Sequence, residues 1–338
     1  MAPPKPQAGA AATRGGGEDA AIDRIRRATE GLSGAAPPGE VWIGDDAALV
    51  RCPPGGLLLA VDAVVAGVHA DLSLVSLADL GWKAHTVAVS DIAAMGGEPG
   101  HALVALCVPP GTEVDQVVGG LAAAAARWGC PVVGGDLSEA DQLVAAVTVT
   151  GTIDEGGPPA LTRTGAAAGD RLFVTGPLGG SAAGLRLLSA RAAEGPGLGG
   201  LAESEGWSAL EEALVAAHRR PEARLAEGRE ARRAGASAAM DISDGLGVDL
   251  DRLARASGVG VRLWDVPVRP GATLEEALGG GEDYELVLAS PDPDRLVAAF
   301  AAAGLRPPLV VGECTADPGE RTLAGRPLAR SGWEHRVG

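Results

Sequence analysis

The chain has 338 residues, of which 46% are hydrophobic and only 3% aromatic, so we expect a core built mainly from small aliphatic side chains. Its formal net charge of −16 argues against a nucleic-acid-binding protein, which would normally carry a basic face. The charge does not argue against phosphate-containing substrates, because clustered carboxylates can hold Mg²⁺, which in turn binds phosphates.

The cysteines and the apolar runs indicate the compartment. The four cysteines, at 52, 107, 130 and 314, show no C-x-x-C spacing, which predicts buried free thiols in a reducing cytoplasm. Apolar runs such as 102–108 have the length of a strand and fall far short of the ~20 residues of a membrane span. Residues 1–17 are rich in Ala, Pro and Gly without an apolar signal core, so we expect a disordered tail. These features predict a cytoplasmic protein with no membrane partner.

In the first half of the chain, hydrophobic periodicity predicts helices that alternate with strands. The clearest helix spans 76–95, where Leu80, Val87 and Asp91 share one stripe and two glycines end the pattern. The segment Thr112-x-x-Asp115 resembles a capping box that opens a helix reaching 128. The other predicted elements are a helix over 19–29, a tight turn at 44–46, and strands over 56–62, 102–108, 131–133 and 143–151.

The second half alternates in the same way after a Gly-Gly-Pro-Pro stretch at 156–159, which is the best candidate for a domain boundary. The sequence therefore predicts an α/β (α+β) protein with two domains, 18–155 and 160–338. The predicted elements here are strands over 171–175, 238–242, 259–264 and 284–289, and helices over 181–189, 208–233, from 246 onward, and 294–303.

Carboxylates recur at the ends of apolar segments. The pair Asp45-Asp46 stands at a glycine turn between two short apolar runs, although Gly-Asp-Asp is also ordinary turn chemistry. Chance explains one or two such placements, but it explains seven poorly, whereas coordination of several Mg²⁺ ions by hard oxygen ligands explains them well. The seven are Asp45, Asp46, Asp62, Asp91, Asp136, Asp241 and Asp244.

Each of these acids also has a structural interpretation. Asp91 lies on the apolar stripe of its helix, where a carboxylate needs a cation or several donors; it is either a metal ligand or a core residue that caps a loop. Asp62 and Asp136 follow apolar strands and could be turn residues. In Asp241-Ile242-Ser243-Asp244, either Ser243 or Asp244 would serve as an N-cap, but that role leaves Asp241 unexplained.

Several common sites are excluded or disfavoured. Neither of the two lysines, Lys5 and Lys83, follows a glycine, so there is no Walker A loop, and no serine stands in a G-x-S-x-G elbow. The G-x-G-x-x-G match at 195–200 has no strand before it and is interpreted as a flexible loop. The histidines at 85, 101 and 218 form no constellation and are predicted to be structural.

At this point the chain resembles the thiamine-monophosphate kinase family, within the superfamily of aminoimidazole ribonucleotide synthetase. The matching stretches run in family order from about residue 18 to the C-terminus. The Gly-Gly-Glu-Asp-Tyr-Glu-Leu string and the terminal Gly-Trp-x-His favour the thiamine branch. The stretches are 43–48, 61–69, 90–99, 134–136, 163–170, 174–179, 240–246, 280–286 and 332–335.

The resemblance implies ATP-dependent phosphorylation of thiamine monophosphate to thiamine diphosphate. It implies a homodimer in which the N-terminal sheets of two subunits close a barrel, and a C-terminal α/β sandwich. Metal ligands carry over to Asp45, Asp62, Asp91, Asp136, Asp241 and Asp244, and ATP contacts to Gly135, Asp136, Arg163 and Ser243. Contacts to the thiamine phosphate are expected from His69, Trp333 and either Glu282 or Asp283.

The chemistry expected from the resemblance needs no general base, because a phosphate monoester is mostly dianionic near neutrality (pKa ~6). The expected catalytic residues are Asp91, Asp244 and Arg163, which act with Mg²⁺ in a direct in-line transfer. One departure is that Ala60-Val61 replaces the family's hydroxyl pair, which removes a hydroxyl ligand. The alternatives are a sister ATP-dependent synthetase and an inactive thiamine-phosphate sensor.

Overall fold

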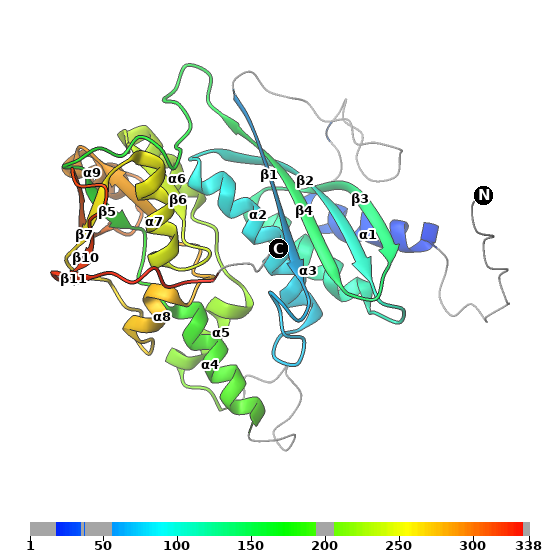
Figure 1. Ribbon diagram of the computed structural model, residues 1–338. Helices are drawn as coiled ribbons and strands as arrows, with labels where there is room; N and C mark the ends of the chain where they lie inside the picture. Colours follow the sequence, from blue (N-terminus) through cyan, green and yellow to red (C-terminus); the bar gives the residue numbers. More distant parts are fainter. Residues whose placement is uncertain (1–17, 35–36, 38–55, 194–205, 334–338) are drawn as a thin grey trace, which may run out of the picture.

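The structure is a computed structural model that describes residues 18–34, 37, 56–193 and 206–333 (Figure 1). The described residues form two α/β halves, each built on its own sheet. The predicted tail, the Asp45-Asp46 turn and the glycine-rich loop at 195–200 lie outside this range. No helix in the described ranges is long and apolar enough to cross a membrane.

The first half contains a four-stranded sheet in the order β1-β4-β2-β3. Helices α2 and α3 pack on one face of this sheet, and α1 packs against α3 (Figure 1). Strands β2 and β3 run parallel, whereas β4 is antiparallel to both of its neighbours. The elements are α1 Glu18–Ser33, β1 Gly56–Val65, α2 Leu77–Ala94, β2 Glu98–Val108, α3 Val114–Trp128, β3 Val132–Glu139 and β4 Val144–Ile153.

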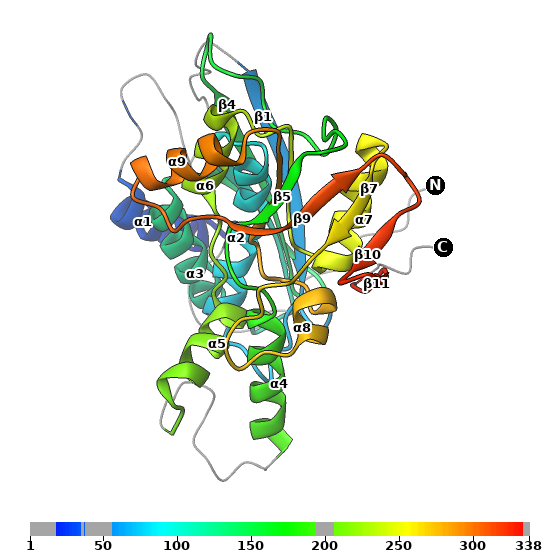
Figure 2. The ribbon, with the colours of Figure 1, turned by 90° about the vertical axis from the view of Figure 1, so that its left-hand side faces the viewer.

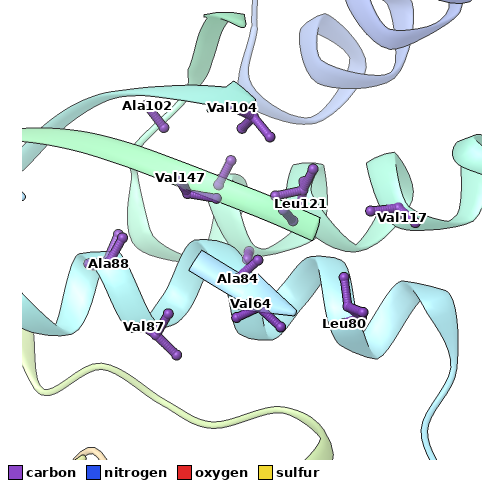
Figure 3. Packing of buried hydrophobic residues seen from close by; sticks show 14 of the residues in the cluster. Val64, Leu80, Ala84, Val87, Ala88, Ala102, Val104, Val117, Leu121 and Val147 are labelled. Atoms are coloured by element: carbon purple, nitrogen blue, oxygen red, sulfur yellow. The ribbon is translucent and has the colours of Figure 1, made fainter. Parts of the chain in front are cut away.

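Helix α2 is the central helix of this half. Ser76 and Asp79 form a capping box at its start, which stabilises a helix by about 1 kcal/mol. Gly81 of α2 and Gly120 of α3 let the two helices cross closely. A Cβ at Gly81, for example, would stand 2.1 Å from the Val117 carbonyl oxygen. Figure 3 shows the resulting apolar core between the helices and the sheet, built from Val64, Leu80, Ala84, Val87, Ala88, Ala102, Val104, Val117, Leu121 and Val147.

The second half is a three-layer α/β sandwich on a seven-stranded sheet in the order β11-β10-β7-β9-β5-β8-β6. Helix α7 covers one face of this sheet, and α6 and α9 cover the other (Figure 2). The elements are β5 Arg171–Val174, α4 Gly180–Ala193, α5 Ala209–Arg219, α6 Leu225–Ala234, β6 Ala238–Asp241, α7 Leu246–Ser257, β7 Gly260–Leu263, α8 Leu274–Gly279, β8 Leu286–Ser290, α9 Pro293–Ala302, β9 Leu309–Thr315, β10 Arg321–Leu323 and β11 Arg326–Pro327.

The two halves meet along the C-terminal end of α2. A Cβ at Gly228 of α6 would stand 1.9 Å from the carbonyl oxygen of Ala93, so glycine is what allows the two helices to touch here. The Arg232 guanidinium, which is almost fully buried, donates to the carbonyl oxygens of Gly96 and Pro158 and to the Asp154 carboxylate. Helix α2 therefore belongs to the core of the first half and also contacts the second half.

Three local predictions were wrong. The capping box at Thr112 does not form, because the Thr112 hydroxyl donates to the carbonyl oxygen of Pro109 and Glu113 is the N-cap without a side-chain bond. Asp62 and Asp136 do not follow their strands but lie within β1 and β3, since both strands continue for several residues. Helix α8 and strands β9, β10 and β11 were not predicted at all.

Candidate active site

One cavity of ≈ 770 Å³ lies between the two halves. It is lined by strand β1, the loop that follows it, one side of α2, the loop after β6, the loop before β8 and the C-terminal segment. Eight of the predicted site residues line this single cavity: Asp62, His69, Asp91, Asp241, Ser243, Asp244, Glu282 and Trp333. Gly135, Asp136, Arg163 and Asp283 do not line it, and Asp45 lies outside the described residues.

Asp62 and Asp91 form the acidic end of the cavity. Their carboxyl groups hydrogen-bond each other, which requires that the pair share a proton when no cation is present. Burial, followed by the negative charges of Asp241 and Asp62, raises the pKa of Asp91 to about 8, although Arg163 opposes the shift. Burial also raises the pKa of Asp62. The arrangement carries more negative charge than its surroundings compensate, which is typical of a cation site.

Asp241 ends strand β6 beside this pair. Its carboxylate accepts a hydrogen bond of 2.7 Å from the hydroxyl of Ser90, the residue before Asp91 on α2. Burial raises the pKa of Asp241 to about 6, and the Ser90 bond and the charge of Arg163 both oppose the shift. Arg163 itself is exposed, and it acts on Asp91 and Asp241 through its charge without lining the cavity. Strand β6 therefore brings Asp241, and helix α2 brings Asp91, to the acidic end of the cavity.

The loop after β6 is shaped by Asp249, which sequence analysis did not single out. Its fully buried carboxylate accepts the backbone N–H groups of Asp244 and Gly245, at 2.9 and 3.1 Å, and bonds the Arg252 guanidinium at 2.8 Å. The N-cap of α7 is Gly245, at φ 119°, without a side-chain bond. The proposed N-cap role of Ser243 or Asp244 was therefore wrong, and the Asp244 carboxylate contacts Arg252 and lines the cavity.

The same loop holds the C-terminal parts of the cavity by its backbone. The carbonyl oxygens of Ile242, Ser243 and Asp244 accept N–H groups from Tyr284, Glu282 and Trp333, at 3.0, 2.7 and 2.9 Å. Glu282 and Tyr284 adopt left-handed backbone angles, φ 57° and 50°, which cost such residues ~1–3 kcal/mol each. The bonds of Glu282 and Tyr284 hold this strained loop in place, and the third bond holds the C-terminal segment at Trp333.

The structure separates the pair Glu282-Asp283. The Glu282 side chain lines the cavity, where Lys83 of α2 bonds both of its carboxylate oxygens. The Asp283 carboxylate instead accepts the N–H groups of Gly179 and Ser181 at the start of α4, at 2.7 and 3.4 Å. Burial raises the pKa of Asp283 to about 6, although these two bonds oppose the shift. Asp283 therefore fixes α4, and Glu282 is the member of the pair placed to meet a ligand.

His69 lies in the loop after β1. Its Nδ1 accepts the Val65 N–H at 3.0 Å, which fixes the orientation of the ring, and its carbonyl oxygen accepts from Lys83 at 3.1 Å. His218, predicted to be structural, also lines the cavity, within 3.1 Å of the Ser181 hydroxyl. Burial and the charge of Lys83 lower the pKa of His218 to about 4, so this ring is neutral near pH 7.

Gly135 and Asp136 lie at the opposite edge of the sheet. The register runs from Asp62 through Val147 and Val104 to Gly135, so three strand spacings, ~14 Å, separate β1 from β3. A Cβ at Gly135 would stand 2.0 Å from the Val104 carbonyl oxygen, which explains the glycine by packing alone. Asp136 pairs with exposed Ala105 on the face of the sheet away from the helices. Within one chain, neither residue reaches the cavity.

Comparisons with known proteins agree on one family. Residues 44–153 match the family model described as AIR synthase related protein, N-terminal domain, and residues 167–324 match the corresponding C-terminal domain. The thiamine-monophosphate kinase of Bacillus subtilis is 38% identical over 260 residues, which are 73% of this chain and 76% of that protein. The thiamine-monophosphate kinase of Aquifex aeolicus is 36% identical over 290 residues, or 81% of this chain and 86% of that protein.

Solved structures show the same relationship. The thiamine-monophosphate kinase from Stenotrophomonas maltophilia is 31% identical, with a TM-score of 0.75 over 91% of this chain and 96% of that chain. A structure described as AaThiL complexed with AMPPCP and TMP is 32% identical, with a TM-score of 0.71 over 94% of this chain and 97% of that chain. Sequence and fold agree, and the chain belongs to the thiamine-monophosphate kinase family of enzymes.

Proposed function

We propose that the protein transfers the γ-phosphoryl group of ATP to thiamine monophosphate and so forms thiamine diphosphate. The observation that carries this proposal is the cavity, in which carboxylates from both halves of the chain stand at one end and His69, Glu282 and Trp333 line the same space. A relative in complex with AMPPCP and TMP supports both substrates. A cytoplasmic location, where ATP is available, is part of the proposal.

The acidic end is proposed to hold several Mg²⁺ ions. The fit rests on the donors. Asp241 is buried and Asp62 and Asp91 are partly buried, all three offer hard oxygen atoms, and burial together with neighbouring negative charge raises their pKa values. In the described part of the chain, no three acidic, histidine or cysteine side chains already form a set that could hold a metal ion. We therefore propose that Asp244, together with Asp45 outside the described residues and the substrate phosphates, supplies the remaining ligands.

The proposed chemistry is direct in-line transfer without a phospho-enzyme. The acceptor phosphate is mostly dianionic near neutrality (pKa ~6), so no side chain has to remove a proton from it. Mg²⁺, when bound, supplies the positive charge that allows two phosphate groups to approach. Asp91 and Asp244 hold this charge in place, and Arg163 and Ser243 are proposed to contact ATP.

The end of the cavity near His69 and Glu282 is proposed to receive the ring portion of thiamine monophosphate. Trp333, which lines the same cavity and is 52% exposed, offers an aromatic surface for this ring. The hydroxyl ligand missing at Ala60 matters at the other end, because Ala60 lies on the same face of β1 as Asp62. One Mg²⁺ is then proposed to take water in its place.

An assay separates the candidate functions. Purified protein, ATP, Mg²⁺ and thiamine monophosphate are incubated, and chromatography measures thiamine diphosphate. We expect ATP and thiamine monophosphate to be converted into ADP and thiamine diphosphate in equal amounts. Absence of thiamine diphosphate above background would refute the proposal. Consumption of ATP only with purine precursors or selenide would favour a sister synthetase. Binding of thiamine monophosphate without turnover would favour a sensor.

Asp249→Asn is expected to lower kcat for diphosphate formation at least tenfold. The asparagine would turn an amide N–H₂ group toward Arg252 or toward the backbone donors, so the loop that carries Asp244 would lose its anchor. Steady-state kinetics measures the effect. The control is Asp292→Asn, the same exchange at the N-cap of α9, which should leave kcat unchanged because Asn caps equally well. A wild-type kcat in Asp249→Asn would contradict the role of this carboxylate.

We further propose a homodimer through the outer face of the four-stranded sheet. This face carries exposed apolar side chains, of which Leu59 is 68% exposed, together with Leu57, Val61 and Leu103. Asp136 lies on the same face, so a second copy packed there would be needed to bring it near a bound nucleotide. A surface of this kind on one side of a sheet is typical of a subunit contact.

Leu59→Glu is expected to give a monomer, because two buried charges would face each other across the proposed contact. Multi-angle light scattering measures the mass, which should halve relative to the wild type. The matched control is Val310→Glu, which places the same charge on an exposed valine of β9 in the second half and should leave the mass unchanged. An unchanged dimer in Leu59→Glu would place the contact elsewhere.

A further inference from the structure

Lys83 is a buried cation in the wall of the cavity, where the two halves of the chain meet, and the proposed chemistry gives it no role. Its side chain is only 2% exposed. Its Nζ donates to both carboxylate oxygens of Glu282, at 2.9 and 3.0 Å, and to the carbonyl oxygen of His69 at 3.1 Å. One ammonium group therefore ties a loop of the first half to a loop of the second half.

The geometry of this contact suits a lysine. An ammonium group has three donors, and here it meets three acceptors, two from Glu282 and one from His69. Arginine presents five donors in a flat, rigid fork, so it would not reproduce these three contacts, which converge on one nitrogen atom. The chain has 28 lysines and arginines, and only Lys5 and Lys83 are lysines. Lys83 is therefore the one lysine in the described residues, in a chain that otherwise uses arginine.

Helix α2 sets the distance between the two ends of the cavity. Lys83, Val87 and Asp91 follow one another at steps of four residues, and all three line the cavity. Eight residues of helix span ~12 Å. Asp91 therefore marks the acidic end, and Lys83 marks the end with His69 and Glu282. The charge of Glu282 is balanced there by Lys83 and not by His218, because the pKa of His218 is lowered to about 4.

We propose that Lys83 is a positioning residue that holds the Glu282 carboxylate and the His69 loop where thiamine monophosphate binds, and so determines the affinity for this substrate. The inference rests on the proposed function. Lys83 acts through Glu282 and the His69 loop, so its loss affects binding of thiamine monophosphate and leaves ATP binding at the acidic end intact.

Lys83→Met keeps most of the length of the side chain and removes its charge. We expect KM for thiamine monophosphate to rise at least tenfold, with KM for ATP and kcat within twofold of the wild type. The matched control is Arg232→Met, because Arg232 is equally buried and also joins two backbone carbonyls and a carboxylate, but away from the cavity. The control should lower the melting temperature and leave KM for thiamine monophosphate unchanged.

A double-substitution cycle tests whether Lys83 acts through Glu282, and it also serves if Lys83→Met alone fails to fold. Glu282→Gln and the double variant Lys83→Met/Glu282→Gln are compared, since the double variant leaves no unpaired buried charge. We expect the double variant to have a KM for thiamine monophosphate within twofold of that of Glu282→Gln.

The outcomes are distinct. An unchanged KM in Lys83→Met, or a KM in the double variant that multiplies the two single effects, would overturn the positioning role. A wild-type protein that forms no thiamine diphosphate would instead overturn the proposed function. Since the wild type is run beside every variant, the two failures cannot be confused.

Discussion

Asp91→Asn is expected to lower thiamine diphosphate formation by roughly 10³-fold, the scale on which one preorganised electrostatic group acts in catalysis. The same substitution is expected to raise the melting temperature of the metal-free protein. The reason is that the pKa of the Asp91 carboxyl, which is partly buried beside Asp62 and Asp241, is raised to about 8, so the group stays protonated at pH values where an ordinary carboxyl is ionised. An asparagine can still donate a hydrogen bond to Asp62, and it carries no charge to bury.

Kinetics and calorimetric melting measure the two effects, and circular dichroism verifies the fold. The control is Asp115→Asn, an exposed acid on α3 that pairs with Arg24 at the surface. It should change neither activity nor melting temperature appreciably, because exposed ion pairs contribute little. Wild-type activity in Asp91→Asn would refute its role. A lower melting temperature would show that Asp91 is structurally required.

The stability of the metal-free protein is expected to fall as the pH rises from about 4 to about 8. Asp91 has a folded-state pKa of about 8, whereas the ordinary pKa of an aspartate is 3.8. For an acid whose pKa is raised on folding, the folded state binds the extra proton, so its stability is highest below the unfolded pKa and is lost as the pH rises through the folded one. Asp241, whose pKa is raised to about 6, acts in the same direction.

We therefore expect the metal-free wild type to melt ~5 °C or more lower at pH 9 than at pH 5, on the scale that links a few kcal/mol to melting temperature in domains of this size. Mg²⁺ should recover most of this loss at pH 9. The Asp91→Asn variant separates the effect from general charge repulsion, because it should show a smaller pH dependence. Equal pH dependence in the variant and the wild type would contradict the assignment.

Much of the fold could be predicted, because the segments that bury one face carry a strong periodic signal. Helix α2 illustrates this, since its stripe of apolar residues predicted both its span and the inward position of Asp91. The α/β class followed in the same way, whereas the C-terminal sandwich was expected from the resemblance to the thiamine-monophosphate kinase family. Strand β9 was missed although it lies inside the second sheet, because Gly312 and Glu313 interrupt its short apolar run.

The candidate site was predicted from acids placed on apolar segments. This signal is local in sequence, so it cannot show roles that depend on contacts between distant parts of the chain. Asp249 carries the same signal as Asp91, an acid on the buried side of an apolar helix, and it could have been found. Lys83 could not, because its role depends on Glu282, which is 199 residues away in sequence. The separation of Glu282 from Asp283 also needed the structure, since the sequence does not show which of the two adjacent carboxylates accepts the Gly179 N–H group and which meets Lys83.

At Asp136 the local pattern predicted a site that the fold of one chain does not place at the cavity. Two glycines before an acid suggested a phosphate site at the end of a strand, but one of these glycines is required by the close approach of the Val104 carbonyl group. The acid then lies on the outer face of β3, away from the cavity. Its place among the metal ligands therefore depends on the proposed dimer.

The most direct test of the account is a single turnover with γ-labelled ATP, thiamine monophosphate and Mg²⁺ over an excess of enzyme, quenched in acid at successive times. We expect the label to pass from ATP into thiamine diphosphate without any labelled protein at intermediate times. Label on the protein before the diphosphate appears, or loss of labelled ATP without labelled diphosphate, would contradict direct transfer at the acidic cavity.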